Sequence, residues 1–440
     1  MVPPDLERRD HAGAVANGRD PGPRNQDMKK LASGGRAKIA NGARERTATR
    51  HLRARGEGAE QQTTAVELFF DLVFVFAITR LSQLVLDDLT IHGLLRAGFL
   101  LLVLWWAWIN TTWLANWLEP QSPRVRLLLM GGALSALLAA AAIPQAFADH
   151  GLLFALAYVG LQVGRNAAAT LLSPAGHHLR LMFARLLFWS MLAGVLWIAG
   201  GVADPDQRLV IWGTALAVDL VAPVLGYPTP LLGRSRTDDY DVDGGQFAER
   251  CQGFVIIALG ESIAVAGATA TRAGLATTTV LALILAFLGT AALWWLYFDT
   301  VADRSRHAIA VSEQAGRLAR DAYTYIHIPI IAGIIVVAVG DDLLLAHPTD
   351  GLSGVGAATV IGGPVLFLLG ETLFRLRMTG TISARRLTCV AALALIAPIS
   401  TSISAIALVG IVTAMLILLA LSEQFTTRSQ AAAVAPSGAA

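Results

Sequence analysis

The chain has 440 residues, of which 55% are hydrophobic and 15% are charged, and its formal net charge is +2. A typical soluble domain carries about a quarter charged residues, so this composition excludes a soluble globular protein of this size. Apolar runs of roughly twenty residues recur along most of the chain, and this is the length that crosses a bilayer core as a helix. The runs do not alternate in segments of about ten residues, which excludes a transmembrane β-barrel. The composition therefore predicts an all-α, polytopic transmembrane helical bundle.

Residues 1–60 differ from all that follows, because they are polar, rich in Gly, Pro and Arg, and lack an apolar core. A cleaved signal peptide needs a short hydrophobic segment, so we interpret this stretch as a disordered basic arm. Residues 425–440 are expected to form a short disordered tail. The two cysteines, Cys251 and Cys389, have no CxxC partner, which excludes a disulfide framework and a zinc ribbon.

Twelve predicted spans follow the arm, six in a first half (61–246) and six in a second half (247–424). Their ranges are 66–86, 93–118, 126–148, 152–173, 180–203, 208–226, 249–270, 276–300, 321–340, 355–376, 387–401 and 403–422. The last two are one apolar run, which we divide at Pro398 because a helix loses a hydrogen bond and bends there.

Arginines alternate between the connections, as expected when they gather on the cytoplasmic side of a membrane. The arm is basic, every second connection carries arginines, and the connections between these are poor in them. The pattern persists over all twelve spans and predicts that both termini are cytoplasmic. The basic connections contain Arg124, Arg126, Arg180, Arg185, Arg234, Arg236, Arg304, Arg306, Arg317, Arg320, Arg377, Arg385 and Arg386.

Two similar stretches indicate an internal repeat. "LWWAWINT" (104–111) ends the second span and "LWWLYFDT" (293–300) ends the eighth, while Glu67 and Glu249 begin the first and seventh spans. Two halves of six spans would be parallel repeats, as in several transporter folds. The alternative is that the Trp pairs are interfacial anchors.

Three ionisable side chains occur in the first span, although a charge inside a bilayer is costly unless it is paired or faces a polar cavity. Glu67 forms a capping box with Thr64, which gives it a structural explanation. Asp71 lies one turn deeper on the same face. Two carboxylates this close either hold a proton between them or share a cation. The alternative is a structural ion pair between Asp71 and an arginine of another span. Arg80 lies on the opposite side of the helix from Asp71, where it pairs across the bundle or reaches the surface.

Further charged groups lie inside later spans. Glu261, beside Gly260 and Ser262, is either functional or part of an interhelical hydrogen bond, and Arg165 is a candidate counter-ion. His327 either titrates near neutral pH or is a hydrogen-bonded core residue. Glu371 is the weakest acidic candidate, because Arg375 follows it by four residues. The predicted ion- or substrate-binding residues are Asp71, Glu67, Glu261, Glu249, Arg80, Arg165, Asp219, Asp299 and His327.

Enzymatic motifs are absent from the sequence. "DYDVDGG" (239–245) begins like a calcium loop, but Arg250 stands where the bidentate Glu is required. "GLSG" (351–354) resembles the serine motif of intramembrane proteases, yet no histidine follows His347. HExxH, Walker A and Rossmann patterns do not occur. We therefore expect no catalytic residue, no metal ion, no cofactor and no nucleic-acid partner.

Three stretches resemble the bacterial low temperature requirement protein A (LtrA) family over about residues 61–424. They are "ELFFDLVFVFAITRLS" (67–82), "ERCQGFVIIALGES" (249–262) and "YTYIHIPIIAGIIVVAVGDD" (323–342). The resemblance implies a multi-pass protein of the bacterial inner membrane with a link to growth at low temperature. The family's second motif reads H-x-x-E-R, whereas this chain has Gln246 at the place of the histidine.

The buried carboxylates and the parallel halves together favour a proton- or cation-coupled transporter of an unknown small solute. One alternative is a cation channel, since Phe70–Asp71 resembles the F-S-D signature of some endolysosomal potassium channels. A second is a non-transporting membrane scaffold or stress factor. The expected partners are the lipid bilayer and a small solute or ion, and the oligomeric state stays open.

Overall fold

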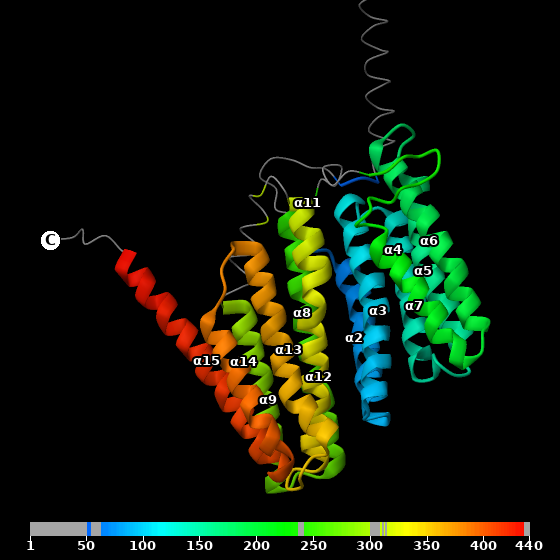
Figure 1. The fold of residues 1–440 in the computed structure, drawn as a ribbon. Coiled ribbons are helices and arrows are strands. Elements are labelled where there is room, and N and C mark those ends of the chain that lie inside the picture. The colour runs from blue at the N-terminus through cyan, green and yellow to red at the C-terminus, as the bar shows by residue number, and fades with distance from the viewer. Residues whose placement is uncertain are drawn as a thin grey trace, which may run out of the picture. The chain divides into compact units, whose positions relative to one another are not determined.

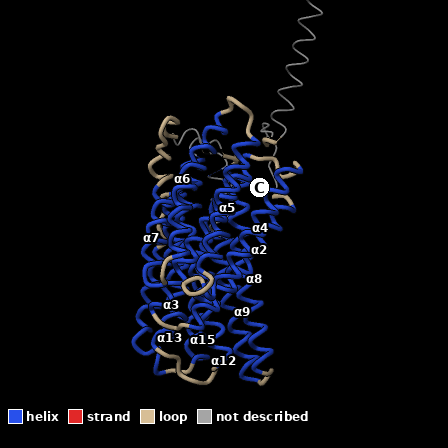
Figure 2. Tube along the Cα trace, turned by 90° about the vertical axis from the view of Figure 1, so that its right-hand side faces the viewer, coloured by secondary structure: helices blue, strands red, loops and turns tan. Residues whose placement is uncertain are grey.

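The computed structural model describes residues 51–53, 63–235, 242–299, 309, 312 and 315–434, and its long helices lie side by side (Figures 1 and 2). Within these residues only isolated bridges occur and no β-strand forms. The predicted all-α helical bundle is therefore confirmed. The predictions for residues 1–50 and for Arg236, Arg304 and Arg306 lie outside the described residues.

The helices follow one another in the order predicted from the apolar runs. In the first half they are α2 (Ala65–Asp87), α3 (Ile91–Trp117), α4 (Pro123–Ala142) with the short helix η1 (Ile143–Gln145), α5 (Gly151–Leu172), α6 (His178–Val202) and α7 (Pro205–Val221). In the second half they are α8 (Gly244–Ala273), α9 (Thr277–Tyr297), α11 (Ala315–Leu318), the π-helix η4 (Ala319–Ile326), α12 (His327–Ala346), α13 (Gly354–Thr379), α14 (Ala384–Ile396), η5 (Ala397–Ser402) and α15 (Ala405–Val434).

Eleven helices of the described residues are long and apolar enough to cross a membrane, so the chain is a multi-pass membrane protein. Each matches one of the predicted spans. The remaining predicted span, 208–226, corresponds to α7, which has 17 residues and ends before Pro223. A proline cannot donate the backbone hydrogen bond that would continue the helix.

Two boundaries differ from the sequence-based ranges in an informative way, and one division agrees with them. Helix α12 continues to Ala346, so Asp341 and Asp342 lie in a helix and not in a connection. The last apolar run divides where expected, because η5 begins at Ala397–Pro398 and α15 starts at Ala405. Helix α15 extends to Val434, beyond the predicted start of the tail at residue 425.

Glycines let α12 and α13 approach closely. A Cβ atom at Gly333 would lie 2.6 Å from the backbone nitrogen of Phe367, and one at Gly363 would lie 2.8 Å from that of Val337. Small residues at such contacts allow helices to pack in a bilayer, where the hydrophobic effect gives little drive for association. These glycines therefore determine how near α12 lies to α13.

Helix α2 links the two predicted halves, because it packs on α3 and α4 and also on α8 and α12. The repeat-related tryptophans differ in burial. Trp105 and Trp106 are buried, whereas Trp294 and Trp295 are 45% and 41% exposed. The second pair has the exposure expected of surface anchors, and the two-repeat arrangement stays a prediction.

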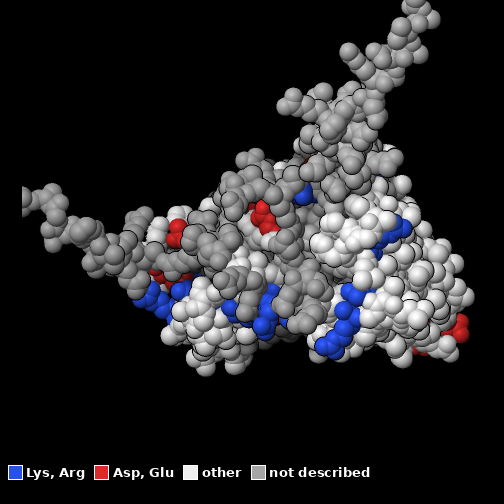
Figure 3. Space-filling view, turned by 90° about the horizontal axis from the view of Figure 1, so that it is seen from above, with Lys and Arg blue, Asp and Glu red and all other residues white. Residues whose placement is uncertain are grey.

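Connections with the predicted cytoplasmic arginines make contacts with one another. Arg377 pairs with Asp321 at 2.8 Å, and Nε of Arg185 donates to the carbonyl oxygen of Leu232 at 2.9 Å. Figure 3 shows the end of the bundle at which α11 lies in Figure 1, with several Lys and Arg side chains on it. The orientation of this end toward the cytoplasm stays a prediction.

Candidate functional site

Glu67 and Asp71, on the first turns of α2, lie against Arg250 of α8. Nη2 of Arg250 donates to Oδ1 of Asp71, and Nη1 lies 3.8 Å from Oε1 of Glu67. The indole Nε1 of Trp108 donates to the same Asp71 oxygen at 2.7 Å. All four residues are buried. Asp71 thus has the ion pair with an arginine of another span that was one of the two alternatives for it.

Glu67 accepts hydrogen bonds from three further parts of the chain. The backbone nitrogen of Thr64 donates to Oε2 at 2.8 Å, and the Thr64 side chain accepts from the backbone nitrogen of Glu67, which together form the expected capping box. The Thr64 hydroxyl also donates to Oε2, at 2.7 Å. Arg53 donates to the same oxygen at 3.0 Å, and Gln246 donates to Oε1 at 2.9 Å. Arg53 belongs to the predicted arm, so at least residues 51–53 lie on the bundle. Gln246 occupies the position of the family's histidine, and here its side-chain amide donates to Glu67.

Among the described residues, the two carboxylates and the two arginines of this cluster balance in charge. A charge-balanced pair that is also hydrogen-bonded is the usual form in which ionised groups persist inside a protein. The geometry of Glu67 and Asp71 is therefore that of a structural cluster, which fastens the start of α2 to α3 and α8.

Two other carboxylates lack a cation partner. Glu261 of α8 is half-buried and accepts a hydrogen bond from the hydroxyl of Thr79 on α2. Asp341 of α12 is 6% exposed, and its Oδ2 lies 3.4 Å from the hydroxyl of Ser262. Within the described part of the chain, neither carboxylate forms an ion pair. A carboxylate held in a bundle without a cation is stable only when a proton or a bound cation neutralises it.

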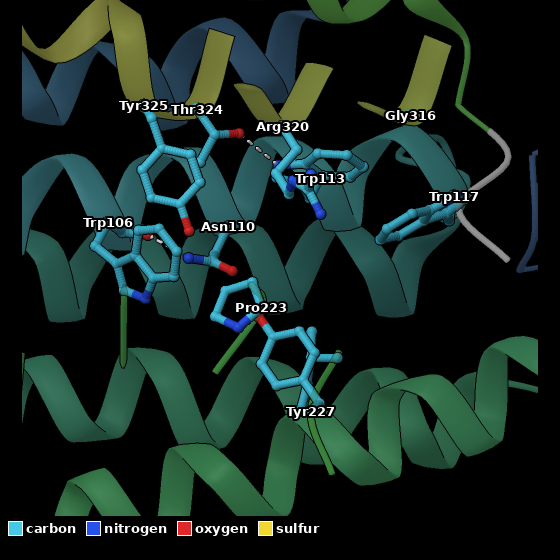
Figure 4. A pocket seen from close by; sticks show the side chains of 11 residues that line it. Trp106, Asn110, Trp113, Trp117, Pro223, Tyr227, Gly316, Arg320, Thr324 and Tyr325 are labelled. Carbon is cyan, nitrogen blue, oxygen red and sulfur yellow. Dashed lines mark hydrogen bonds between the residues drawn. The ribbon is translucent and has the colours of Figure 1, made fainter. Parts of the chain in front are cut away.

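A cavity lies between α3, α6, the segment after α7, and η4 (Figure 4). Residues 106–117 of α3 line one wall, and 316–325 of α11 and η4 line another. The indole of Trp113 donates to the hydroxyl of Thr324 at 3.0 Å, and the phenol of Tyr325 donates to the carbonyl oxygen of Leu220 at 3.0 Å. Residues of both predicted halves therefore build this cavity.

A second, smaller cavity adjoins the first, because the two share Trp106, Asn110, Leu186 and Tyr227. Its other lining residues are mainly polar and come from α5, α6 and α7. They are Gln162, Arg165, Asn166, Trp189, Ser190, Asp219 and Ala222.

Arg165 is 4% exposed, and within the described residues its hydrogen bonds go to neutral oxygens. Its Nη1 donates to the hydroxyl of Thr111 at 3.2 Å and to the carbonyl oxygen of Ala107 at 3.3 Å, and its Nε to Oδ1 of Asn166 at 3.4 Å. No ion pair of Arg165 occurs among the described residues. The structure therefore does not place this candidate counter-ion beside Asp71.

Asp219 lines the same small cavity from α7. Its Oδ2 accepts hydrogen bonds from the phenol of Tyr158 and the indole of Trp197, each at 3.0 Å. The amide nitrogen of Gln162 donates to the Tyr158 oxygen at 3.0 Å, whereas Oε1 of Gln162 is buried without a hydrogen-bond partner. The small cavity thus contains one cation, one carboxylate and one unpaired acceptor.

The other candidates lie away from these cavities. Arg80 donates to Gln83 at 2.8 Å and stacks on Phe76, Glu249 is half-buried, and Asp299 is exposed. His327 is fully buried: its Nε2 lies 2.9 Å from the phenol of Tyr297, and its Nδ1 lies 3.2 Å from the carbonyl oxygen of Ala322. This is the geometry of a hydrogen-bonded core histidine.

Glu371 has a partner that the sequence did not indicate. Arg386 of α14 donates to Glu371 at 2.5 Å and to Glu423 of α15 at 2.8 Å, all three buried. Arg375, four residues further on, is the partner that the sequence indicates, but the ion pair shown for Glu371 among the described residues is with Arg386. Sequence reasoning also missed Arg250, Gln162 and Asp341, because their roles depend on contacts between separate helices. Within the described residues, no cluster of His, Cys, Asp and Glu could hold a metal ion.

Comparisons with known proteins agree with the resemblance seen in the three motifs. The model of the bacterial low temperature requirement A protein family matches residues 62–421. The chain is also 39% identical over 318 residues to the uncharacterized protein RA0937 of Rhizobium meliloti strain 1021, covering 72% of this chain and 77% of that protein. No solved structure gives a significant match. The chain therefore belongs to the bacterial low temperature requirement A protein family.

Proposed function

We propose that the chain is a proton- or cation-coupled secondary transporter of a small solute in the bacterial inner membrane, and that the two adjoining cavities bind the solute. The supporting observation is that α3, α6 and the segment after α7 share the larger cavity with η4 of the other predicted half. Transporters made of two halves bind their solutes at the interface between the halves, where relative movement changes access. The chain acts in this proposal without an enzymatic step.

Two properties of the larger cavity support a binding role. Its lining is mainly aromatic and apolar with a few polar groups, as is usual for small-molecule sites. One wall is the π-helix η4, and single π-helical turns within α-helices often occur at functional sites.

Coupling is assigned to Glu261 and Asp341. Asp71 already has a cation partner in Arg250, so it has less need of a mobile ion. Among the described residues, Glu261 and Asp341 have hydroxyl groups as partners, those of Thr79 and Ser262. Glu261 belongs to α8, and Asp341 contacts the next residue of this helix, Ser262. The two carboxylates therefore lie at the same level of α8. A proton or cation that neutralises one of them supplies the coupling.

The experiment is uptake into proteoliposomes from a mixture of small bacterial metabolites, measured by mass spectrometry with and without an imposed pH, Na⁺ or K⁺ gradient. We expect at least one solute to accumulate against its own gradient only when one of these ion gradients is present. In Asp341→Asn and Glu261→Gln, solute movement should become independent of the ion gradient, while the exposed control Asp299→Asn should behave like the native protein.

Solute accumulation that does not depend on any of the three ion gradients would contradict coupling of transport to a proton or cation. Sustained single-channel currents in planar bilayers would indicate the cation channel instead. The absence of both currents and solute movement would leave the non-transporting scaffold.

A further inference from the structure

Within the described residues, no carboxylate forms a direct ion pair with the buried charge of Arg165. Its three hydrogen bonds go to neutral oxygens, and its Nη2 has no hydrogen-bond partner among the described residues. A guanidinium is matched in shape and charge by a carboxylate, which accepts two parallel hydrogen bonds from it. In a membrane bundle, an arginine without a paired anion is expected to face one in a polar cavity. Arg165 therefore suits a carboxylate on the solute.

Acceptors of hydrogen bonds line the same small cavity. Only Oδ2 of Asp219 is used, by Tyr158 and Trp197, so Oδ1 has no partner in the described part of the chain. Gln162 is only 4% exposed, and its buried Oε1 has no hydrogen-bond partner among the described residues either. A buried acceptor that loses its hydrogen bond costs about 1–3 kcal/mol, so the unpaired oxygen of Gln162 favours a donor in the cavity, and Oδ1 of Asp219 can accept from the same donor. An ammonium group supplies up to three such hydrogen bonds.

Asp219 and Arg165 line one cavity and yet form no ion pair with each other. The cavity therefore presents separated charges of opposite sign. This arrangement disfavours a dianion, which Asp219 repels, and a simple cation, which Arg165 repels. It suits a small molecule that carries both charges close together.

The adjoining larger cavity is aromatic. Trp106 and Tyr227 line both cavities, and Trp113, Trp117 and Tyr325 line the larger one (Figure 4). Aromatic walls bind apolar and aromatic groups by burying area and by ring packing. Two charges at one end and an aromatic chamber beside them define a molecule with a zwitterionic head and an apolar body.

We infer that the solute is a free α-amino acid with an aromatic or large apolar side chain, its carboxylate on Arg165, its ammonium on Asp219 and Gln162, and its side chain among the tryptophans. The inference rests on the proposed function, because it identifies the solute of that same site.

The first test uses the native, full-length protein in detergent and needs no variant. Binding of L-phenylalanine and L-tryptophan is measured by isothermal titration calorimetry and by the rise in Tm that a ligand of the folded state produces. Three analogues each lack one feature: phenethylamine lacks the carboxylate, 3-phenylpropionate lacks the ammonium, and glycine lacks the side chain. We expect L-phenylalanine or L-tryptophan to bind and each analogue to bind at least about 10-fold more weakly, because the unmatched groups of the site stay unpaired.

The second test uses variants of the two charged residues. Asp219→Asn should weaken binding of L-phenylalanine but not of 3-phenylpropionate, and Arg165→Gln should weaken L-phenylalanine but not phenethylamine. The exposed Asp299→Asn is the matched control. The inference is overturned if neither amino acid binds the native protein, which would leave Arg165 and Asp219 as a water-separated structural pair. It is also overturned if the analogues bind as tightly as the amino acids.

The outcomes separate this inference from the proposed function. Gradient-driven uptake of a different solute, with no amino-acid binding, would leave transport standing and remove the substrate class. Amino-acid binding without any gradient-driven uptake would support the substrate class and contradict the proposed transport.

Discussion

Replacement of Asp71 by Asn removes one charge from the buried cluster at the start of α2 and leaves the guanidinium of Arg250 without its hydrogen-bonded anion. The nearest remaining carboxylate is that of Glu67, whose Oε1 lies 3.8 Å from Nη1 and already accepts a hydrogen bond from Gln246. Removal of one partner from a buried ion pair costs about 3–5 kcal/mol, because the other charge stays buried and uncompensated. Since Asp71 and Arg250 are each 1% exposed, water cannot restore the missing interaction. We therefore expect Asp71→Asn to lose about 3–5 kcal/mol of unfolding free energy.

The assay is unfolding in mixed micelles followed by far-UV circular dichroism. The double variant Asp71→Asn/Arg250→Gln removes both charges, and it should be more stable than Asp71→Asn alone. Asp299→Asn, at an exposed residue, should lie within about 0.5 kcal/mol of the native protein. If Asp71→Asn unfolds like the native protein while its uptake loses ion coupling, the structural interpretation of the pair is refuted and Asp71 is an ion-carrying group.

Two further predictions concern packing and coupling. Gly333→Val should destabilise the bundle by at least roughly 1–3 kcal/mol in the same unfolding assay, because even a Cβ would lie 2.6 Å from the backbone nitrogen of Phe367. Gly362→Ala is the control, because the added carbon would meet no atom within 4 Å beyond its own stretch of helix, and this variant should be at least as stable as the native protein. Equal effects of the two substitutions would contradict the close contact at Gly333. In a host that depends on this chain for growth in the cold, Asp341→Asn and Glu261→Gln should fail to restore growth at low temperature while being present in the membrane at native amounts. Full restoration by both variants would favour the non-transporting scaffold.

Several features of the fold follow from residues close together in sequence. The spans could be predicted because a run of about twenty apolar residues satisfies its own backbone hydrogen bonds as a helix in lipid, whatever its neighbours are. Two further features could be predicted because each involves only one turn of backbone. They are the capping box of Thr64 and Glu67 and the break at Pro398. The end of α12 was placed too early because Asp341 and Asp342 are polar, and only tertiary contacts keep that last turn buried.

The partners of the charged residues depended on the tertiary structure. Asp71 and Arg250 are 179 positions apart, and Arg386 reaches Glu371 from another helix, whereas the neighbouring Arg375 had been the expected partner. The two cavities likewise arise where α3, α5, α6, α7 and η4 meet. Hydropathy determines that a helix enters the bilayer, but lipid is as apolar as most side chains and gives little preference for one neighbour over another. Which helices face each other is decided by glycine contacts and by the pairing of buried polar groups, and both depend on the whole bundle.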